Sequence, residues 1–294
     1  MYNFSENYNT TKSEFDARLN EYLSSFDYYP RLNEAMQYSV DAGGKRLRPV
    51  LMIECAKMIG LPTEKIMPLA IAIEMIHTYS LIHDDLPCMD DDDLRRGKPT
   101  SHKVFGEDMA VLAGDGLLNL AMETALLGYE SEYGDNYINA VKYLFACSGP
   151  DGMIGGQVID IVNTGEFQSL DELKVMHSKK TGALFNACCM CPALILGSNS
   201  DIISGLQEYS FHLGVLFQVK DDILDVIGDE AEMGKTIGKD EANNKSTFIS
   251  LLGLKESITY SIDIAEKAKS PLMKFEGKNE FLLGLVQYIL ERKN

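Results

Sequence analysis

The feature that most constrains this sequence is a pair of aspartate-rich stretches, set far apart in a chain with helical periodicity. The first runs from His77 to Lys98 within and after an apolar helical run. The second is shorter and reads FQVKDDILD from Phe217 to Asp225. We therefore expect one site that is assembled from two facing helices. The aspartates and arginines of the first stretch are Asp84, Asp85, Asp90, Asp91, Asp92, Asp93, Arg95 and Arg96.

Clustered carboxylates repel one another, and two like charges about 4 Å apart cost roughly 4 kcal/mol at an effective dielectric constant near 20. Unless water solvates such a cluster it needs cations, and hard divalent metal ions prefer oxygen ligands. Mg²⁺ is commonly held by one or two carboxylates together with substrate phosphates, and arginine grips phosphate oxygens. The first stretch therefore indicates a diphosphate held between metal ions and basic side chains. A solvated acidic loop is the alternative for Asp91, Asp92 and Asp93.

The motif DDLPCMDDDDLRRG, followed by FQVKDDILD, resembles the first and second aspartate-rich motifs of the trans-prenyltransferases. More narrowly, it resembles the bacterial farnesyl and geranylgeranyl diphosphate synthases, whose first motif has four residues between the Asp pair and the next Asp. The resemblance extends from the GGKRLRP segment to the C-terminal helix. It implies an all-α isoprenoid synthase-type fold, a bundle of roughly ten or more helices around a central cavity.

Length and composition fit a single domain that spans residues 1–294, because no linker, low-complexity run or repeat interrupts the chain. The net charge of −17 argues against a nucleic-acid or anionic-membrane surface, although metal ions can still recruit an anionic substrate. The N-terminus lacks the features of a signal peptide, and no apolar run approaches the ~20 residues of a membrane span. We expect a cytoplasmic protein with free cysteines.

Helical periodicity is present along most of the chain, and there is neither strand alternation of useful length nor a hairpin signal. Pro87 should end the helix that carries Asp84, so that residues 87–98 form a loop and Asp90 can turn back towards Asp84. His77 lies seven residues before Asp84 and shares its face of the helix. The predicted helices cover 14–26, 31–40, a run from Pro49, 64–85, 107–129, 136–145, 170–196, 202–227 and three short segments within 246–294.

Two sets of basic residues accompany the acidic stretches. Lys45 and Arg48 precede or begin an apolar helix and make a plausible anion site, although an ordinary basic turn fits equally well. The resemblance implies that isopentenyl diphosphate binds there, with His77 and Arg96. It further implies that the allylic diphosphate is met by Arg95, Lys180, Lys235 and Lys245, and that Thr181 and Gln218 contact the rest of the allylic substrate.

The resemblance also implies a reaction and its metal ligands. Mg²⁺, or alternatively Mn²⁺, would be held by Asp84, Asp85, Asp90, Asp221, Asp222 and Asp225. Together with Arg95, Lys180 and Lys235 it would stabilise the diphosphate that leaves dimethylallyl or geranyl diphosphate as a carbocation forms. Isopentenyl diphosphate would attack this cation, while Thr181 and Gln218 steady it. A homodimer is expected.

Tyr79 and Ser80 are the expected determinants of product length. Ser80 lies one helical turn before Asp84, and Tyr79 lies on the flank of that face, where it could equally pack outwards. In the family, an aromatic residue five positions before the first motif goes with C15 products, so we predict farnesyl diphosphate. A geranylgeranyl diphosphate synthase shares the same motifs and is the alternative. A non-catalytic subunit of a heteromeric synthase should have lost site residues, and a class I terpene cyclase needs no second diphosphate site.

Overall fold

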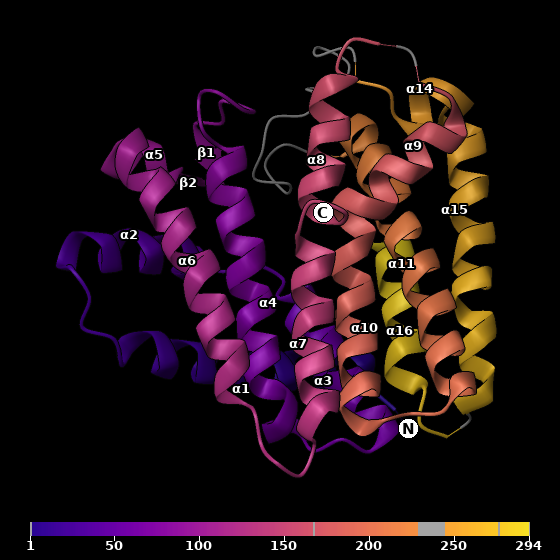
Figure 1. Ribbon diagram of the computed structural model, residues 1–294. Coiled ribbons are helices and arrows are strands. Elements are labelled where there is room, and N and C mark those ends of the chain that lie inside the picture. Colours follow the sequence, from indigo (N-terminus) through magenta and orange to yellow (C-terminus); the bar gives the residue numbers. More distant parts are fainter. Residues whose placement is uncertain (1, 167, 229–244, 276, 294) are drawn as a thin grey trace.

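The computed structural model describes residues 2–166, 168–228, 245–275 and 277–293. Its helices run side by side as a bundle, with α4 and α6 to the left of α7, α8, α10, α11 and α15 in Figure 1. The predicted all-α fold is thereby confirmed. The α-helices are α1 Phe4–Ser24, α2 Pro30–Asp41, α3 Leu47–Ile59, α4 Thr63–Asp84, α5 Ser101–Phe105, α6 Glu107–Leu127, α7 Gly134–Ser148, α8 Met153–Val162, α9 Leu170–His177, α10 Ala183–Leu196, α11 Ser200–Ile227, α14 Phe248–Leu252, α15 Leu254–Lys269 and α16 Glu280–Glu291.

Some helix boundaries differ from those read from the sequence, for local reasons. Helix α1 begins well before residue 14, because the side chain of Asn3 accepts a hydrogen bond from the backbone N–H of Glu6 and caps the helix. The predicted helix over 170–196 is divided by a π-helical segment, Ser178–Gly182. Such segments are rare and often occur at functional sites.

Helices α4 and α6 pack against each other, and the carboxylates of the first acidic stretch lie at and after the C-terminal end of α4. By length and composition, both are apolar enough to cross a membrane, although no apolar run of that length was expected from the sequence. In this structure, however, 67% of the apolar window of α4 is buried inside the protein, as expected of a core helix.

A short antiparallel hairpin follows α4, where no hairpin was expected. Strand β1 (Leu94–Arg95) pairs with β2 (Lys98–Pro99), and the register places Arg95 opposite Lys98. The turn residues Arg96 and Gly97 have φ of 55° and 74°. Positive φ at both central residues is the requirement of a type I′ turn. Strands of two residues are too short to give a sequence alternation, so the prediction was wrong here.

A buried ion network joins the N-terminal helices to α4. The guanidinium of Arg46 donates to Asp16 at 2.9 Å, to Glu74 at 2.7 Å and to the Val40 carbonyl at 2.8 Å. The side chains of Arg46 and Glu74 are only 3% and 2% exposed. Because Arg46 immediately precedes α3, the network fixes the start of the helix that carries Arg48.

We predict that Glu74→Gln lowers the free energy of unfolding by about 3 kcal/mol, because removal of one partner leaves buried charge uncompensated. Denaturant unfolding would measure it. Arg18→Ala is the control, since its ion pair with Glu21 is exposed, and it should leave the midpoint nearly unchanged. Equal, small effects of both variants would contradict the structural role of the network.

Candidate active site

The first acidic stretch folds back on the end of α4. Asp84 is the last residue of the helix and Asp85 is its C-cap. The backbone N–H of Asp90 donates to the Asp84 carbonyl at 2.9 Å, and that of Asp92 donates to the Asp85 carbonyl at 3.2 Å. The predicted return of Asp90 towards Asp84 is therefore present, and it clusters the carboxylates beside the helix terminus.

Asp84 carries the clearest electrostatic signature of the cluster. Burial raises the pKa of its carboxyl to about 6, and the charges of Asp90 and Asp85 act in the same direction. Lys180 and Arg95 oppose this shift. When burial and like charges raise the pKa of a carboxyl group, an added cation would stabilise its ionised form.

Asp85 has a protein counterion. The carboxylate of Asp85, a residue only 3% exposed, accepts from Nε of Arg95 at 3.0 Å, and Nη2 of Arg95 contacts it as well. The same Nη2 lies 3.3 Å from Asp92. The hairpin thus places Arg95 on the acidic cluster, and these two predicted site residues bind each other here.

A chain of alternating charges runs across the cluster. Nζ of Lys180, in the π-helical segment, lies 2.5 Å from Asp160 of α8. Lys245 lies 3.9 Å from the same carboxylate and 3.6 Å from Asp90. Asp160, which is 9% exposed, is not among the residues predicted for the site. Its signal in the sequence is that it is the single charged residue of the helix MIGGQVIDIV.

The second acidic stretch lies on α11 and meets the same π-helical segment. Thr181 donates to Oε1 of Gln218 at 3.2 Å, and Nε2 of Gln218 donates to Asp222 at 2.9 Å. The other oxygen of Asp222 accepts from the backbone N–H of Phe248 at 2.8 Å. Both oxygens of Asp222 therefore have protein donors, while Asp225 lies buried one turn further along α11. The two stretches meet through residues 178–182.

Asp221 is paired with the end of the chain. The guanidinium of Arg292 contacts the Asp221 carboxylate and donates to the Phe217 carbonyl at 3.0 Å. It also lies 4.2 Å from the centre of the Phe217 ring. Arg292 is not among the residues predicted for the site. Its contact with Asp221 spans 71 positions, so no local sequence pattern indicates it.

A basic cluster surrounds His77 of α4. Nη1 of Arg48 lies 3.3 Å from Nε2 of His77. Since arginine can only donate, Nε2 accepts and the proton of a neutral His77 resides on Nδ1. Burial lowers the pKa of His77 well below its usual value, and the charges of Arg48, Arg96, Arg95 and Arg46 lower it further. The predicted residues Arg48, His77 and Arg96 are therefore neighbours.

Further contacts define this basic cluster. Burial lowers the pKa of Arg48, so this half-buried cation is poorly solvated, whereas Arg96 is exposed. A Cβ at Gly44 would lie 2.4 Å from Cζ of Arg96, so the absence of a side chain there admits the guanidinium beside the segment that holds Lys45. Asp221 is among the carboxylates that act on Arg48. Converging cations of this kind are suited to an anion such as diphosphate.

The donor chemistry fits a metal that is shared with a ligand. Within the described ranges, no three His, Cys, Asp or Glu side chains are arranged to hold a metal ion by themselves. Mg²⁺ typically uses one or two carboxylates plus phosphate oxygens and waters, so a complete protein cage is not required. Asp84 and Asp90 on one side and Asp221 on the other offer such carboxylates. Lys235, predicted to act here, lies outside the described residues.

Tyr79 and Ser80 lie on α4 just before the acidic cluster. Tyr79 is 6% exposed, and the charge of Asp84 adds to burial in raising the pKa of its hydroxyl to about 12. Ser80 donates to the His77 carbonyl at 2.9 Å, a contact within the helix. Tyr79 is therefore a buried ring near the end of α4 that carries the acidic cluster.

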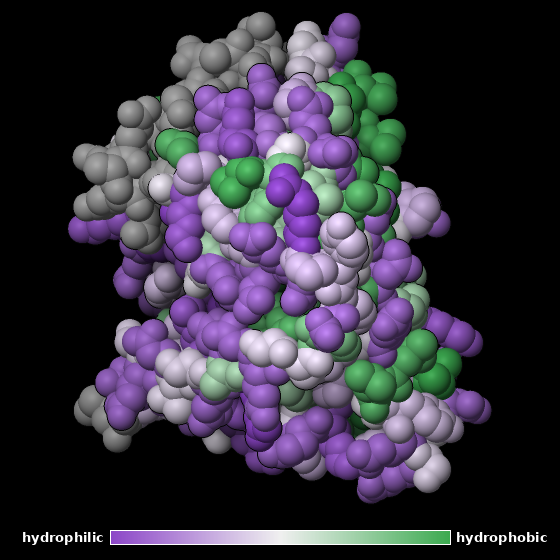
Figure 2. Space-filling model, turned by 90° about the vertical axis from the view of Figure 1, so that its left-hand side faces the viewer, coloured by the Kyte–Doolittle hydropathy of each residue, from purple (hydrophilic) through white to green (hydrophobic). Residues whose placement is uncertain are grey.

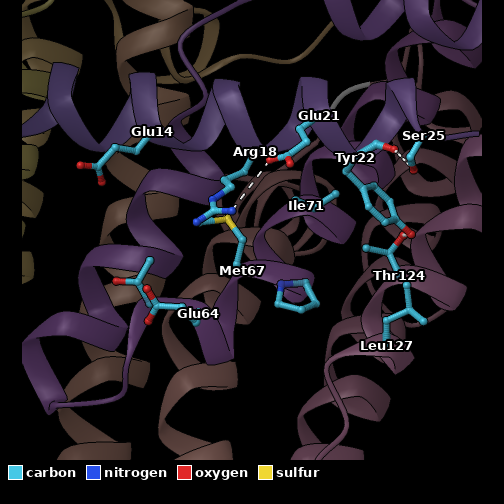
Figure 3. A pocket seen from close by; sticks show the side chains of 12 residues that line it. Glu14, Arg18, Glu21, Tyr22, Ser25, Glu64, Met67, Ile71, Thr124 and Leu127 are labelled. Atoms are coloured by element: carbon cyan, nitrogen blue, oxygen red, sulfur yellow. Dashed lines mark hydrogen bonds and ion pairs between the residues drawn. The ribbon is translucent and has the colours of Figure 1, made fainter.

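A separate cavity of about 830 Å³ lies at the other end of α4. Figure 3 shows it between α1, the start of α4 and the end of α6, with Arg18 turned towards Met67 and Tyr22 bonded to Thr124. None of the predicted site residues lines it. About 20 Å of helix separates Ile71 from Asp84, so this cavity is not part of the acidic site.

We predict that Arg96→Met raises the Kd for inorganic diphosphate at least about tenfold in the presence of EDTA, because it removes one charge-assisted donor from the basic cluster. Calorimetric titration would measure the Kd. Lys103→Met is the matched control, since Lys103 is an exposed neighbour of the hairpin that pairs with Asp93. Equal affinities of the wild type and Arg96→Met would show that diphosphate binds elsewhere.

Known proteins resemble this chain both in sequence and in fold. A family model described as polyprenyl synthetase matches residues 29–272. The farnesyl diphosphate synthase of Geobacillus stearothermophilus is 43% identical over 88% of this chain and 89% of its own length. The heterodimeric geranylgeranyl pyrophosphate synthase large subunit 1 of Arabidopsis thaliana is 45% identical over 90% and 73%. A geranyltransferase of Helicobacter pylori, solved with magnesium and isoprenyl diphosphate, superposes with a TM-score of 0.82 at 32% identity over 99% and 98%.

Proposed function

The chain belongs to the polyprenyl synthetase family, and we propose that it is a short-chain trans-prenyl diphosphate synthase that makes farnesyl diphosphate. This prenyltransferase condenses isopentenyl diphosphate with dimethylallyl diphosphate and then with geranyl diphosphate. One observation carries the proposal: an acidic cluster that suits a metal-bound diphosphate and a basic cluster that suits a second diphosphate lie beside the same helix, α4. A condensation between two diphosphates needs both.

The basic cluster would bind isopentenyl diphosphate. Arg48 and Arg96 supply forked donors, and Lys45 precedes the helix that carries Arg48. His77 stays neutral between these arginines, so it accepts from Arg48 and orients it without adding a competing charge. The diphosphate would replace the solvation that burial has taken from the Arg48 guanidinium.

The acidic cluster would hold the allylic diphosphate through metal ions. Mg²⁺, with Mn²⁺ as the alternative, neutralises charge on the leaving diphosphate when it is bound. Asp84 and Asp90 are the best-placed carboxylates of the first stretch, and Asp221 is that of the second. Asp85, Asp222 and Asp225 complete the proposed set. In this structure Asp85 is engaged with Arg95, Asp221 with Arg292, and Asp222 with Gln218 and Phe248.

Basic side chains would take up the same diphosphate. Lys180 and Lys245 are held by Asp160, which keeps both ammonium groups near Asp84 and Asp90 before a ligand arrives. Arg95 reaches the cluster from the hairpin, and we assign Lys235 to the same set. This fixed positive charge stabilises the transition state without reorganisation.

The reaction is then a heterolysis followed by an addition. The allylic carbon–oxygen bond breaks, its electron pair leaves with the diphosphate, and an allylic cation remains. The double bond of isopentenyl diphosphate attacks the cation, and a proton then leaves to the released diphosphate. Thr181 and Gln218, linked at 3.2 Å, present oxygen dipoles to the cation, and apolar walls exclude water.

Geranylgeranyl diphosphate synthase is the second candidate, because relatives of that name are as similar as the farnesyl diphosphate synthases. The buried ring of Tyr79 below the acidic cluster favours the shorter product. A non-catalytic subunit is disfavoured, since the acidic and basic residues expected of an active synthase are all present.

We further propose that the enzyme is a cytoplasmic homodimer. Figure 2 views the side on which α5 and α6 lie, where hydrophobic patches interrupt a mostly hydrophilic surface. On α6, Leu112, Leu126 and Leu127 are 53%, 46% and 70% exposed. A second copy covering such apolar side chains would remove them from water.

Both acidic stretches should be required for chemistry. We predict that Asp84→Ala and Asp221→Ala each lower kcat by at least about 10²-fold, the effect of losing a main charge stabiliser. Steady-state kinetics with Mg²⁺ would measure this. Lys103→Met, which removes an exposed charge nearby, should retain activity. Near wild-type turnover of either Asp variant would exclude the two-stretch metal site.

Product analysis tests the function itself. With isopentenyl diphosphate, dimethylallyl diphosphate and Mg²⁺, the wild type should release mainly the C15 product. Tyr79→Ala should extend products to C20 and beyond, because the ring no longer closes the space below the acidic cluster. A wild type that makes mainly C20 would favour the geranylgeranyl alternative. The absence of any condensation would reject the proposed function.

A further inference from the structure

The position of Tyr79 depends on packing alone. Its hydroxyl is buried and has no hydrogen-bond partner within the described part of the chain. Its ring instead meets the edge of the His83 imidazole, with centroids 5.7 Å apart and an interplanar angle of 76°. The two residues are one helical turn apart on the same face of α4. Tyr79 is therefore held by an aromatic neighbour and not by a polar anchor.

His83 in turn is anchored on α6. Its Nε2 lies 3.1 Å from the carbonyl oxygen of Val111, so Nε2 carries the proton and donates. The imidazole occupies space that only a glycine leaves open: a Cβ at Gly114 would lie 2.1 Å from Nε2 and 2.5 Å from Cδ2. Contact distances this short are not tolerated, so any side chain at Gly114 must displace the imidazole.

We propose that His83, seated in the space beside Gly114, is a positioning residue for product length that fixes the ring of Tyr79. The inference rests on the proposed function, in which Tyr79 closes the space below the acidic cluster. It extends that function from one residue on α4 to a contact between α4 and α6. Gly114 and His83 touch neither substrate nor metal in this assignment and act through Tyr79.

The directions in which the side chains leave α4 distinguish this positioning role from metal binding. Residues four apart share a helical face, whereas consecutive residues point about 100° apart. Tyr79 and His83 therefore face α6, while Asp84 points elsewhere although it is adjacent in sequence. A shift of the imidazole should change where the growing chain stops and leave the metal-bound diphosphate largely in place.

The test compares two Gly→Ala variants on one helix. Gly114→Ala places a methyl group against the His83 ring. Gly116→Ala, the matched control two residues along α6, has its one close contact with the flexible Met36 thioether, at 2.8 Å from Sδ. With isopentenyl and dimethylallyl diphosphates, Gly114→Ala should raise the ratio of C20 to C15 products about fivefold. A change of this size corresponds to the free energy of one edge-to-face aromatic contact. Gly116→Ala should keep the wild-type ratio.

Two further variants make the outcome decisive. His83→Ala should shift the ratio in the same direction as Gly114→Ala, and it serves if Gly114→Ala does not fold. Adding Gly114→Ala to Tyr79→Ala should produce no further shift, because both changes act on one contact. The inference is overturned if Tyr79→Ala lengthens the products while Gly114→Ala and His83→Ala do not, an outcome that leaves the proposed function standing. If the wild-type protein instead shows no condensation activity, the proposed function itself is rejected.

Discussion

The charge of the carboxylates at the end of α4 is the constraint on which the rest of the site depends. Asp84 and Asp85 lie at a helix C-terminus, where the helix dipole already disfavours negative charge. Burial and mutual repulsion add to this cost, as the raised pKa of Asp84 shows. The cluster persists because distant segments bring cations to it: Arg95 from the hairpin, Lys180 from the π-helical segment and Lys245 from the residues before α14.

The basic cluster around His77 has the opposite electrostatic problem, because positive charges converge there. Arg46 is paired with Asp16 and Glu74, and that pairing serves the fold. Arg48 is desolvated and has a neutral histidine as its hydrogen-bonding neighbour, and Arg96 is exposed beside it. Neighbouring arginines therefore divide into one that holds helices together and others suited to a ligand. With an acidic and a basic cluster beside one helix, the proposed site would give two diphosphates different partners.

The sequence predicted what local pattern can specify and missed what arises over long distances. Helical periodicity gave the all-α fold, and Pro87 gave the return of Asp90 towards Asp84. The ion pair of Lys180 with Asp160 joins two helices 20 positions apart, and that of Arg292 with Asp221 spans 71. Neither Asp160 nor Arg292 belongs to a sequence pattern from which its partner could be predicted. The hairpin at Arg96 was missed because strands of two residues have no period.

These internal ion pairs determine how the proposed ligands would bind. Arg95 with Asp85, Lys180 with Asp160 and Arg292 with Asp221 keep charges satisfied without a ligand. A metal diphosphate would bring both signs of charge. Asp85, Asp160 and Asp221 would then be free to pair with metal ions, and Arg95, Lys180 and Arg292 with phosphate oxygens. Binding of this kind would exchange partners and leave no buried charge unpaired. Because the helices hold these groups in place beforehand, little reorganisation is left for the step in which the carbon–oxygen bond breaks.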